Sequence, residues 1–301
     1  MFKRVGLFIA VNICVMVVAS FTIGFITKFF GLGSSYGPQG INYGSLMTIC
    51  LVWGMAGSFV SLFISKWMAK SMYGVQIMEL SGNYGQLVQK VHFLAKRAGI
   101  SKMPEVGVYD SPEANAFATG PSKNNSLVAV STGLMNQMND DELEGVLAHE
   151  IAHVANGDMV TMALVQGVVN AFVMFFARIV TFAIDSFLRG DDEEEGGGLG
   201  FFASMFVNMA LQVIFGILAA PIVMGFSRWR EYRADAGSAQ LAGKEKMIAA
   251  LEALKRNYDN LGDVEASAQT MQISSKESFM ELFSSHPPLQ KRIDALRRLS
   301  R

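Results

Sequence analysis

Long apolar blocks alternate with polar stretches along this chain of 301 residues. Each of four blocks is long enough for a helix that crosses the hydrocarbon core of a bilayer; the blocks cover residues 5–27, 41–64, 159–184 and 200–226. A short glycine-rich loop separates the first two blocks, and a run of acids and glycines separates the last two. We therefore predict about four transmembrane helices, arranged as two hairpins.

The first block has a competing interpretation as a cleaved signal peptide, because Lys3 and Arg4 precede it and residues 18–20 form a weak cleavage site. The apolar run continues past that site and is longer than the hydrophobic core of a usual signal peptide. A retained membrane anchor is therefore favoured.

Basic residues flank the outer ends of the first hairpin, and only Lys28 lies in its loop. The positive-inside rule then places both ends of this hairpin in the cytoplasm. Three arginines after the fourth block agree with that side: Arg228, Arg230 and Arg233. The acidic residues 191–195 favour a flexible solvated loop over a cation or substrate site. We expect this loop to face the periplasm.

Arg178 interrupts the apolar character of the third block. A charged side chain inside a membrane span is expensive and usually faces a partner or the interface. Two arrangements remain open for Arg178: the guanidinium snorkels to the interface, or it pairs within the helix bundle.

The remaining segments, residues 71–158 and 227–301, have the mixed polarity of a soluble domain. Apolar residues at helical spacing predict helices over 84–98, 243–258 and the segment after Pro287-Pro288. Alternating valines predict strands over 105–109 and 126–131, with a further edge strand within 113–119. The Ser/Gln-rich residues 263–278 predict a mobile loop. The fold class is therefore mainly α with a small β-sheet.

Composition supports a membrane protein, since 51% of residues are hydrophobic and only 17% charged, whereas soluble domains have about a quarter charged. The net charge of -1 gives no sign of nucleic-acid binding. Both cysteines, Cys14 and Cys50, lie inside apolar blocks. This position argues against a disulfide framework and against a thiolate metal site.

A His-Glu-x-x-His sequence just before the third block carries the chemistry. Residues 138–142 offer a helix N-cap followed by acids, and Asn156-Gly157 offers a stop. On this helix His149 and His153 are four residues apart and project from one face, so both can bind one Zn²⁺ per chain. Glu150 can accept a proton from a water molecule at the metal without being a ligand.

A catalytic zinc takes a third protein ligand and keeps one position open. Glu231 is the candidate, and Asp235 four residues later shares its helical face, where it can accept the second ring N–H of His149. This Glu-x-x-x-Asp pattern is common on helix surfaces. Combined with His-Glu-x-x-His, it matches the third-ligand helix of the gluzincin type of zinc protease.

Further stretches complete a recognisable set, at residues 115–120, 127–134, 156–162, 234–239 and 286–289. Together with the two motifs above, they resemble the HtpX family of bacterial inner-membrane heat-shock zinc metalloproteases, which is related to the CAAX prenyl proteases. The resemblance extends over essentially the whole chain.

The resemblance implies a membrane-embedded zinc endopeptidase of the bacterial inner membrane, with its active site facing the cytoplasm. Its substrates would be misfolded or damaged membrane proteins, in protein quality control and the stress response. Its protease domain would have two parts, 71–158 and 227–301, separated by the transmembrane hairpin 159–226 and preceded by the hairpin 1–70. No nucleic-acid partner is implied, and the oligomeric state is left open.

The resemblance also implies roles for residues outside the metal motifs. A strand containing Asn115, Ala116 and Phe117 would pair with the substrate backbone. His286 would make a catalytic contact with the substrate or the transition state, with Arg292 as its companion in substrate binding. The alternative for His286 is a residue at a helix N-terminus, held by the two prolines that follow.

Two other functions compete with a quality-control protease. A CAAX-type processing protease of narrow specificity would share every motif, but its relatives enclose a large intramembrane chamber with more spans than the four blocks here. A non-catalytic scaffold that only binds zinc would not need the base Glu150, which is present.

Overall fold

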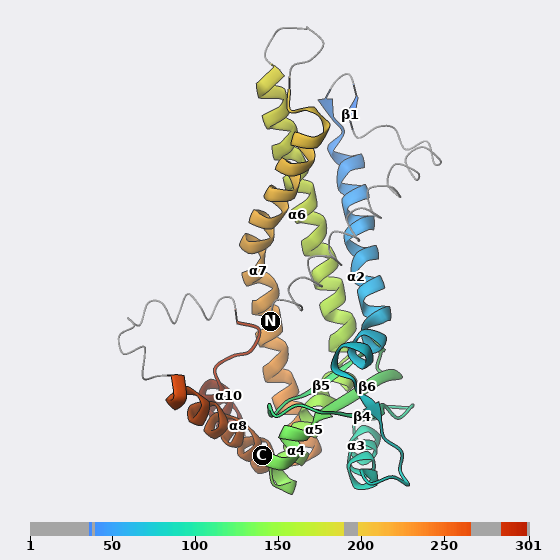
Figure 1. The fold of residues 1–301 in the computed structure, drawn as a ribbon, viewed down its shortest axis with the longest axis vertical. Helices are drawn as coiled ribbons and strands as arrows, with labels where there is room; N and C mark the ends of the chain where they lie inside the picture. Colours follow the sequence, from blue (N-terminus) through green and yellow to red (C-terminus); the bar gives the residue numbers. More distant parts are fainter. Residues whose placement is uncertain (1–35, 38–39, 190–197, 266–283, 300–301) are drawn as a thin grey trace. The chain divides into compact units, whose positions relative to one another are not determined.

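The computed structural model describes residues 36–37, 40–189, 198–265 and 284–299 (Figure 1). The first predicted span, residues 5–27, lies outside the described residues. So do the acidic residues 191–195, Cys14 and nearly all of the loop predicted at 263–278.

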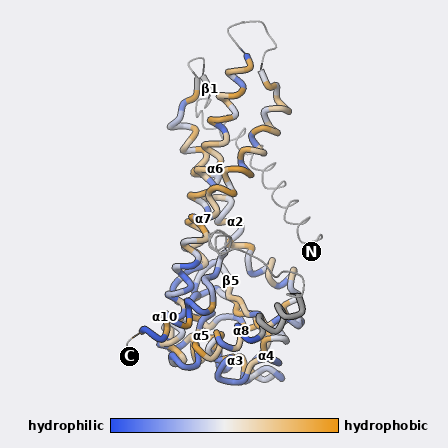
Figure 2. The backbone as a smooth tube through the Cα atoms, turned by 90° about the vertical axis from the view of Figure 1, so that its left-hand side faces the viewer, coloured by the Kyte–Doolittle hydropathy of each residue, from blue (hydrophilic) through white to orange (hydrophobic). Residues whose placement is uncertain are grey.

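Three helices among the described residues are long and apolar enough to cross a membrane: α2 (Tyr43–Tyr73), α6 (Asp158–Arg189) and α7 (Gly200–Leu241). α6 and α7 contain the third and fourth predicted spans, and α2 contains the second except for its first two residues. Figure 2 shows hydrophobic colour spread along α6 and α7, and hydrophilic colour concentrated on α3 (Gly85–Arg97) and α10 (Leu289–Arg298).

Each of these long helices continues beyond the apolar block that predicted it. α7 is the clearest case, since its 42 residues run from the apolar block through Pro221 into the polar sequence that carries Glu231. The predicted span, residues 200–226, is therefore only the apolar part of a longer helix. Loss of hydrophobicity alone does not end a helix, and the next glycine, Gly237, lies inside α7; only Gly243, with a positive φ, follows its end.

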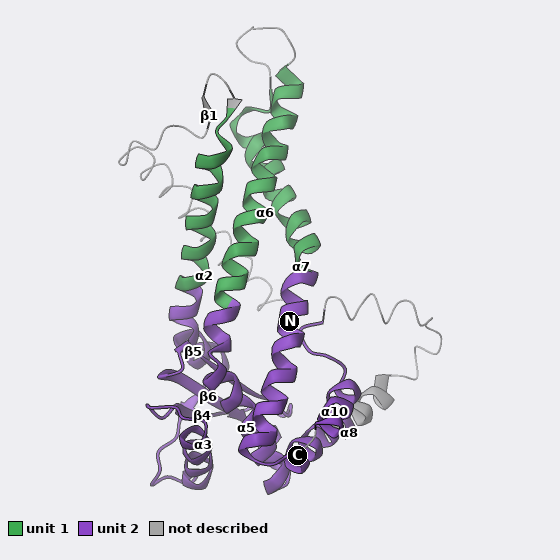
Figure 3. Ribbon diagram, turned by 180° about the vertical axis from the view of Figure 1, so that it is seen from behind, with its two compact units in different colours: residues 1–60, 163–220 green, residues 61–162, 221–301 purple. Residues whose placement is uncertain are grey.

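The chain divides into two compact units, coloured separately in Figure 3. One comprises Met1–Val60 and Ala163–Ala220, and the other comprises Ser61–Met162 and Pro221–Arg301. All three boundaries between the units fall inside α2, α6 and α7. The same three helices therefore supply residues to both units.

In the first unit α2 and α6 pack closely. A Cβ added at Gly54 would lie 2.4 Å from the backbone oxygen of Gly167, so only glycine allows this approach. Leu46 and Cys50 pack against Ala171 nearby. The end of α6 is joined to the start of α7 by the Asp185 carboxylate, which accepts a hydrogen bond from the amide of Leu199 at 2.8 Å. Strands β1 (Tyr36–Gly37) and β2 (Gly40–Ile41) pair before α2.

The second unit contains a mixed four-stranded sheet of order β3-β4-β6-β5. Its strands are β3 (Gln76–Ile77), β4 (Glu105–Tyr109), β5 (Ala116–Ser122) and β6 (Asn125–Ser131). β4 and β6 are parallel, as the connection through an edge strand allows, and β5 pairs antiparallel with β6. The predicted edge strand is therefore present, although it begins at Ala116 and not at residue 113.

Helix α5 (Asp140–Asn156) lies at the centre of this unit. Its residues Leu147, Ile151 and Val154 are fully buried against α3 and the valines of β6. Helices α4 (Thr132–Gln137) and α8 (Lys244–Glu265) complete the described part of the unit together with α10. A mainly helical fold with a small sheet was predicted, and the structure confirms it.

Candidate metal centre

Local sequence determines where α5 begins and ends. The Asn139 side chain accepts hydrogen bonds from the amides of Asp141 and Glu142, and the Glu142 side chain accepts from the amide of Asn139, which forms a capping box. At the other end Gly157 has φ 70°, the left-handed conformation that glycine adopts most easily. Both ends were predicted.

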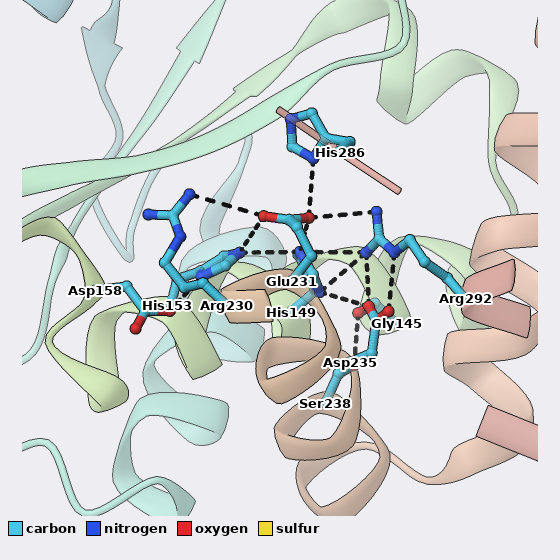
Figure 4. Close-up of polar contacts among 10 residues, drawn as sticks. All are labelled: Gly145, His149, His153, Asp158, Arg230, Glu231, Asp235, Ser238, His286 and Arg292. Atoms are coloured by element: carbon cyan, nitrogen blue, oxygen red, sulfur yellow. Dashed lines mark hydrogen bonds and ion pairs between the residues drawn. The ribbon is translucent and has the colours of Figure 1, made fainter. Parts of the chain in front are cut away.

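The two histidines of α5 face each other and the third predicted ligand. The Nε2 atoms of His149 and His153 are 3.1 Å apart. Glu231 of α7 reaches both imidazoles, with Oε2 3.5 Å from His149 Nε2 and Oε1 3.3 Å from His153 Nε2. Figure 4 shows the three side chains pointing toward one another.

These separations suit one zinc ion. Ligand atoms about 2.0–2.2 Å from a tetrahedral zinc lie about 3.3–3.6 Å from each other, close to the three distances found. All three residues are buried, and their ligand atoms lie within 4.8 Å of one another. Two imidazoles and one carboxylate are also the donor set of a common class of catalytic zinc site.

Each imidazole has a second carboxylate at its other nitrogen. His149 Nδ1 lies 3.0 Å from Asp235 Oδ1, as predicted. His153 Nδ1 lies 2.6 Å from Oδ2 of Asp158, the first residue of α6, which is 2% exposed. Such carboxylates fix the ring tautomer and leave the Nε2 lone pair for a metal.

The electrostatics of the site follow from these pairs. Burial by itself lowers the pKa of His153, but hydrogen bonds to Asp158 and Glu231 outweigh it and raise the pKa to about 9. Burial also opposes the charged form of His149, and bonds to Asp235 and Glu231 raise its pKa in the same way. Both imidazoles are therefore surrounded by acceptors that favour a cation at their centre.

Glu150 follows His149 in α5 and is half-buried. Its negative charge contributes to the raised pKa of His153, so it acts on the group of ligands through the electric field. Among the described contacts of the site, Glu150 does not share a hydrogen bond with His149, His153 or Glu231. This carboxylate is thus near the ligands without being held by them.

Two arginines lie on opposite sides of Glu231 (Figure 4). Arg292 of α10 is 5% exposed, binds Asp235 through Nε and Nη2, and places Nη1 3.3 Å from Glu231 Oε2. Arg230 places Nη2 3.8 Å from Glu231 Oε1. The guanidinium of Arg292 is therefore directed at the carboxylates of the site, an arrangement that differs from the substrate contact expected for it.

His286 lies above the ligand group and is largely open to solvent. Its side chain is 63% exposed, and Nδ1 lies 2.9 Å from Glu231 Oε2. The residue precedes α10, whose N-cap is Pro288. His286 thus lies two residues before the helix cap, with Pro287 between them.

The strand proposed to hold substrate is the edge strand β5. Ala116 pairs with Val130 and Phe117 with Ala129 of β6, while the Asn115 amide donates to Ser131 Oγ at 3.0 Å. The opposite edge of β5 has no strand partner among the described residues. The Phe117 ring packs against Tyr73 and Tyr109, so its side chain is part of the fold.

The family model described as peptidase family M48 matches residues 82–300. This chain belongs to peptidase family M48. It is 50% identical over 301 residues to Protease HtpX of Tolumonas auensis, covering 99% of both chains. It is 52% identical over 297 residues to Protease HtpX of Shewanella pealeana, covering 98% of this chain and 99% of that one.

Among solved structures, the M48 chain is similar to the crystal structure of S. mikatae Ste24p, with a TM-score of 0.57 and 20% identity. The similarity covers 95% of this chain and 65% of that chain, and at this identity it shows a shared fold. The described residues include three apolar helices long enough to span a bilayer, and this member of family M48 is a membrane metalloprotease of the HtpX family.

Sequence analysis missed two contacts of this M48 site. Asp158 was only part of a matching stretch, although an acid directly after the helix stop Gly157 could have drawn attention to His153. Arg292 was paired with substrate, whereas it binds Asp235. The contact of Arg292 with Asp235 has no sequence signal of its own, because the two residues come from helices far apart in the chain.

Proposed function

We propose that this membrane metalloprotease is a zinc-dependent endopeptidase of the gluzincin type. His149, His153 and Glu231 would hold one zinc ion, and Glu150 would be the general base. Zinc, when bound, supplies a Lewis acid that polarises a peptide carbonyl and lowers the pKa of water towards about 7. The observation that carries this proposal is the convergence of three buried donor atoms at 3.1–3.5 Å from one another.

The other residues of the site would hold or move protons. Asp235 and Asp158 keep the Nδ1 protons of the two histidines in place, so that both Nε2 atoms point to the metal position. Glu150 takes a proton from the attacking water and delivers it to the leaving amine. Its half-buried position beside His149 gives it access to both the ligand group and solvent.

Substrate would bind along β5. An extended peptide can add to an open strand edge through backbone hydrogen bonds, and Asn115, Ala116 and Phe117 begin that edge. Because the Phe117 ring is packed between tyrosines, this residue would contribute through its backbone. β5 also packs against α5, the helix of the two histidines.

His286 would serve the transition state. Its imidazole is the most exposed side chain that contacts the ligand group, and it lies on the solvent side of Glu231. An N–H donor at that position can bind the oxygen that becomes negative when the carbonyl is attacked. Asn115 and His286 would therefore affect turnover and leave metal binding unchanged.

The cellular setting completes the proposal. With the first apolar block included, the chain would cross the bacterial inner membrane four times, with the site in the cytoplasm. Its substrates would be misfolded or damaged membrane proteins. Basic residues at the site end of α2, Lys66 and Lys70, and the arginines around Glu231 support the cytoplasmic side.

The test compares wild type with Glu150→Gln in casein hydrolysis by purified protein, alongside zinc analysis. The variant should retain its zinc and lose at least about 100-fold in rate, the usual contribution of a general base. Glu144→Gln, in the same helix but paired with Lys246, is the matched control and should retain activity. Chelation should abolish wild-type hydrolysis. Wild-type turnover by Glu150→Gln would disprove the mechanism.

The same assay separates the competing functions. A processing protease of narrow specificity would bind zinc and leave casein intact, and a scaffold would bind zinc without hydrolysing any peptide. The broad specificity proposed here requires that casein and unrelated unfolded proteins are all cleaved.

A further inference from the structure

Helix α7 has an exposed apolar stripe that ends at the level of the metal site. Ile214 and Leu218, one helical turn apart in the first unit, are exposed. In the second unit Ile222 is exposed, and Trp229 lies on the same side two turns later with 51% of its surface exposed. Arg233, one turn beyond, stacks its guanidinium on the Trp229 ring at 4.8 Å. The stripe thus finishes in an aromatic residue followed by a cation.

The opposite face of the same turns carries the site. Ser227, Glu231 and Asp235 are all buried, with Glu231 1% exposed. Residues two positions apart in an α-helix point in directions that differ by about 200°, and they are about 3 Å apart along the helix axis. Trp229 and Glu231 therefore lie on opposite sides of α7 at nearly the same level along its axis.

Helix α2 repeats this pattern where it enters the same unit. Phe63, Ile64 and Trp67 are exposed along one face, and Trp67 is 69% exposed. The preceding residue, Lys66, instead turns its ammonium to Glu105 of β4 at 2.8 Å. At this level of α2, the face with Trp67 is apolar and exposed, whereas the adjacent face with Lys66 contacts the β-sheet of the same unit.

A lipid bilayer explains why the exposed apolar faces of α2 and α7 end in a tryptophan. Tryptophan concentrates at the membrane interface, because its large ring is apolar while its N–H requires a polar partner. An arginine beside it can extend its cation to the phosphates. Both α2 and α7 are candidate spans. Lipid acyl chains would surround their apolar stripes, and the lipid headgroups would lie at the level of Trp67 and Trp229.

We propose that Trp67 and Trp229 lie in the headgroup layer, so that the metal centre on the other side of α7 acts at the membrane surface. The enzyme then prefers peptide bonds a few residues from the end of a membrane segment. This inference rests on the proposed function and defines its substrate class. A bond at the end of a long flexible tether visits the site less often, since effective concentration falls roughly as the −3/2 power of tether length.

Tryptophan fluorescence tests the depth without using activity. The chain has 3 tryptophans, so Trp53→Phe with Trp67→Phe leaves Trp229 alone, and a second variant leaves Trp53 alone. Both are reconstituted in phosphatidylcholine–phosphatidylglycerol vesicles that carry bromine at known acyl-chain depths. Trp229 should be quenched best by the shallowest bromine. Trp53, about 21 Å along α2 from Trp67, should respond best to a deeper one.

Quenching by acrylamide, which is dissolved in the water, identifies a tryptophan that lies outside the bilayer. Strong quenching of Trp229 by acrylamide, with no response to any brominated lipid, would overturn the assignment to the headgroup layer. Trp53 in the same vesicles reports whether the protein is inserted, so a failed reconstitution is recognised and repeated.

A substrate series tests the preference. One cleavage sequence is placed about 5, about 15 or about 40 residues from a single membrane span on a Gly/Ser tether, and all are reconstituted with the enzyme. The rate should fall about 20-fold from the shortest to the longest tether. Equal rates would overturn the inference while leaving the proposed function intact. No cleavage at any spacing, with casein also intact, would overturn the proposed function and the inference with it.

Discussion

Arg292 holds the carboxylate of Asp235 through two hydrogen bonds, from Nε to Oδ2 at 2.8 Å and from Nη2 to Oδ1 at 2.6 Å. The same Oδ1 lies 3.0 Å from Nδ1 of His149. A residue of the last described helix, α10, thus reaches a metal-ligand candidate on α5 through a carboxylate on α7. The geometry makes Arg292 a positioning residue for His149 of α5.

Arg292→Lys should therefore weaken zinc binding by about 10–100-fold, the usual effect of losing a partner behind a ligand. Lysine retains the charge but cannot form the two-pronged contact with Asp235. Arg297→Lys is the control, because Arg297 lies on the same helix with 55% of its side chain exposed. Zinc competition with a chelating dye measures the affinity. Unchanged affinity in Arg292→Lys would contradict the positioning role.

Asp158 should matter for zinc as much as Asp235 does. Asp158→Asn keeps the size of the side chain but removes the negative charge that stabilises the Nδ1 proton of His153, so zinc affinity should fall about 10–100-fold. Asp140→Asn is the matched control, since that exposed acid at the start of α5 pairs with Lys90. If the two variants bind zinc equally well, the Asp158 contact has no role in the site.

The ligand set predicts a graded loss of metal. Glu231→Ala should contain almost no zinc after purification, and Asp235→Asn should contain an intermediate amount. Glu252→Ala, an exposed acid that pairs with Arg297, should retain the wild-type content. Metal analysis by mass spectrometry measures all three. A full complement of zinc in Glu231→Ala would require a different third ligand.

Topology follows from the chemistry. One zinc must contact α5 before α6 and Glu231 after the apolar part of α7, so the chain between them crosses the bilayer an even number of times. Two crossings suit helices apolar enough to span. With Cys14 and Cys50 removed, Gly197→Cys should label from outside intact cells and Ser267→Cys only after lysis. Labelling of Gly197→Cys only after lysis would leave two spans instead of four.

Local features of this protein could be predicted from sequence because they depend on neighbouring residues. The cap at Asn139, the stop at Gly157 and the alternating valines of β4 and β6 act within one or two turns of the chain. The i, i+4 spacing of His149 and His153 places two ligands on one face before any tertiary contact forms. The apolar blocks likewise predict spans by length alone.

The predicted span marks where α7 stops being apolar and does not mark where the helix ends, because hydropathy is a different property from helix propensity. Polarity changes near residue 226, yet the helix continues to Leu241. That continuity decides the function of the segment, since it places Glu231 on a helix that begins among the apolar residues of the span. From the hydropathy pattern alone, the membrane span and the segment that carries Glu231 were separate parts of the chain.

Tertiary structure alone decided the environment of the charges. A buried carboxylate or guanidinium is stable only if the fold supplies partners, and here those partners come from different helices. Asp158 faces His153 across a helix boundary, and Arg292 of α10 meets Asp235 of α7. Sequence analysis could name candidate metal ligands and Asp235 from their spacing, but the contacts of Asp158 and Arg292 are defined only by how α5, α6, α7 and α10 pack.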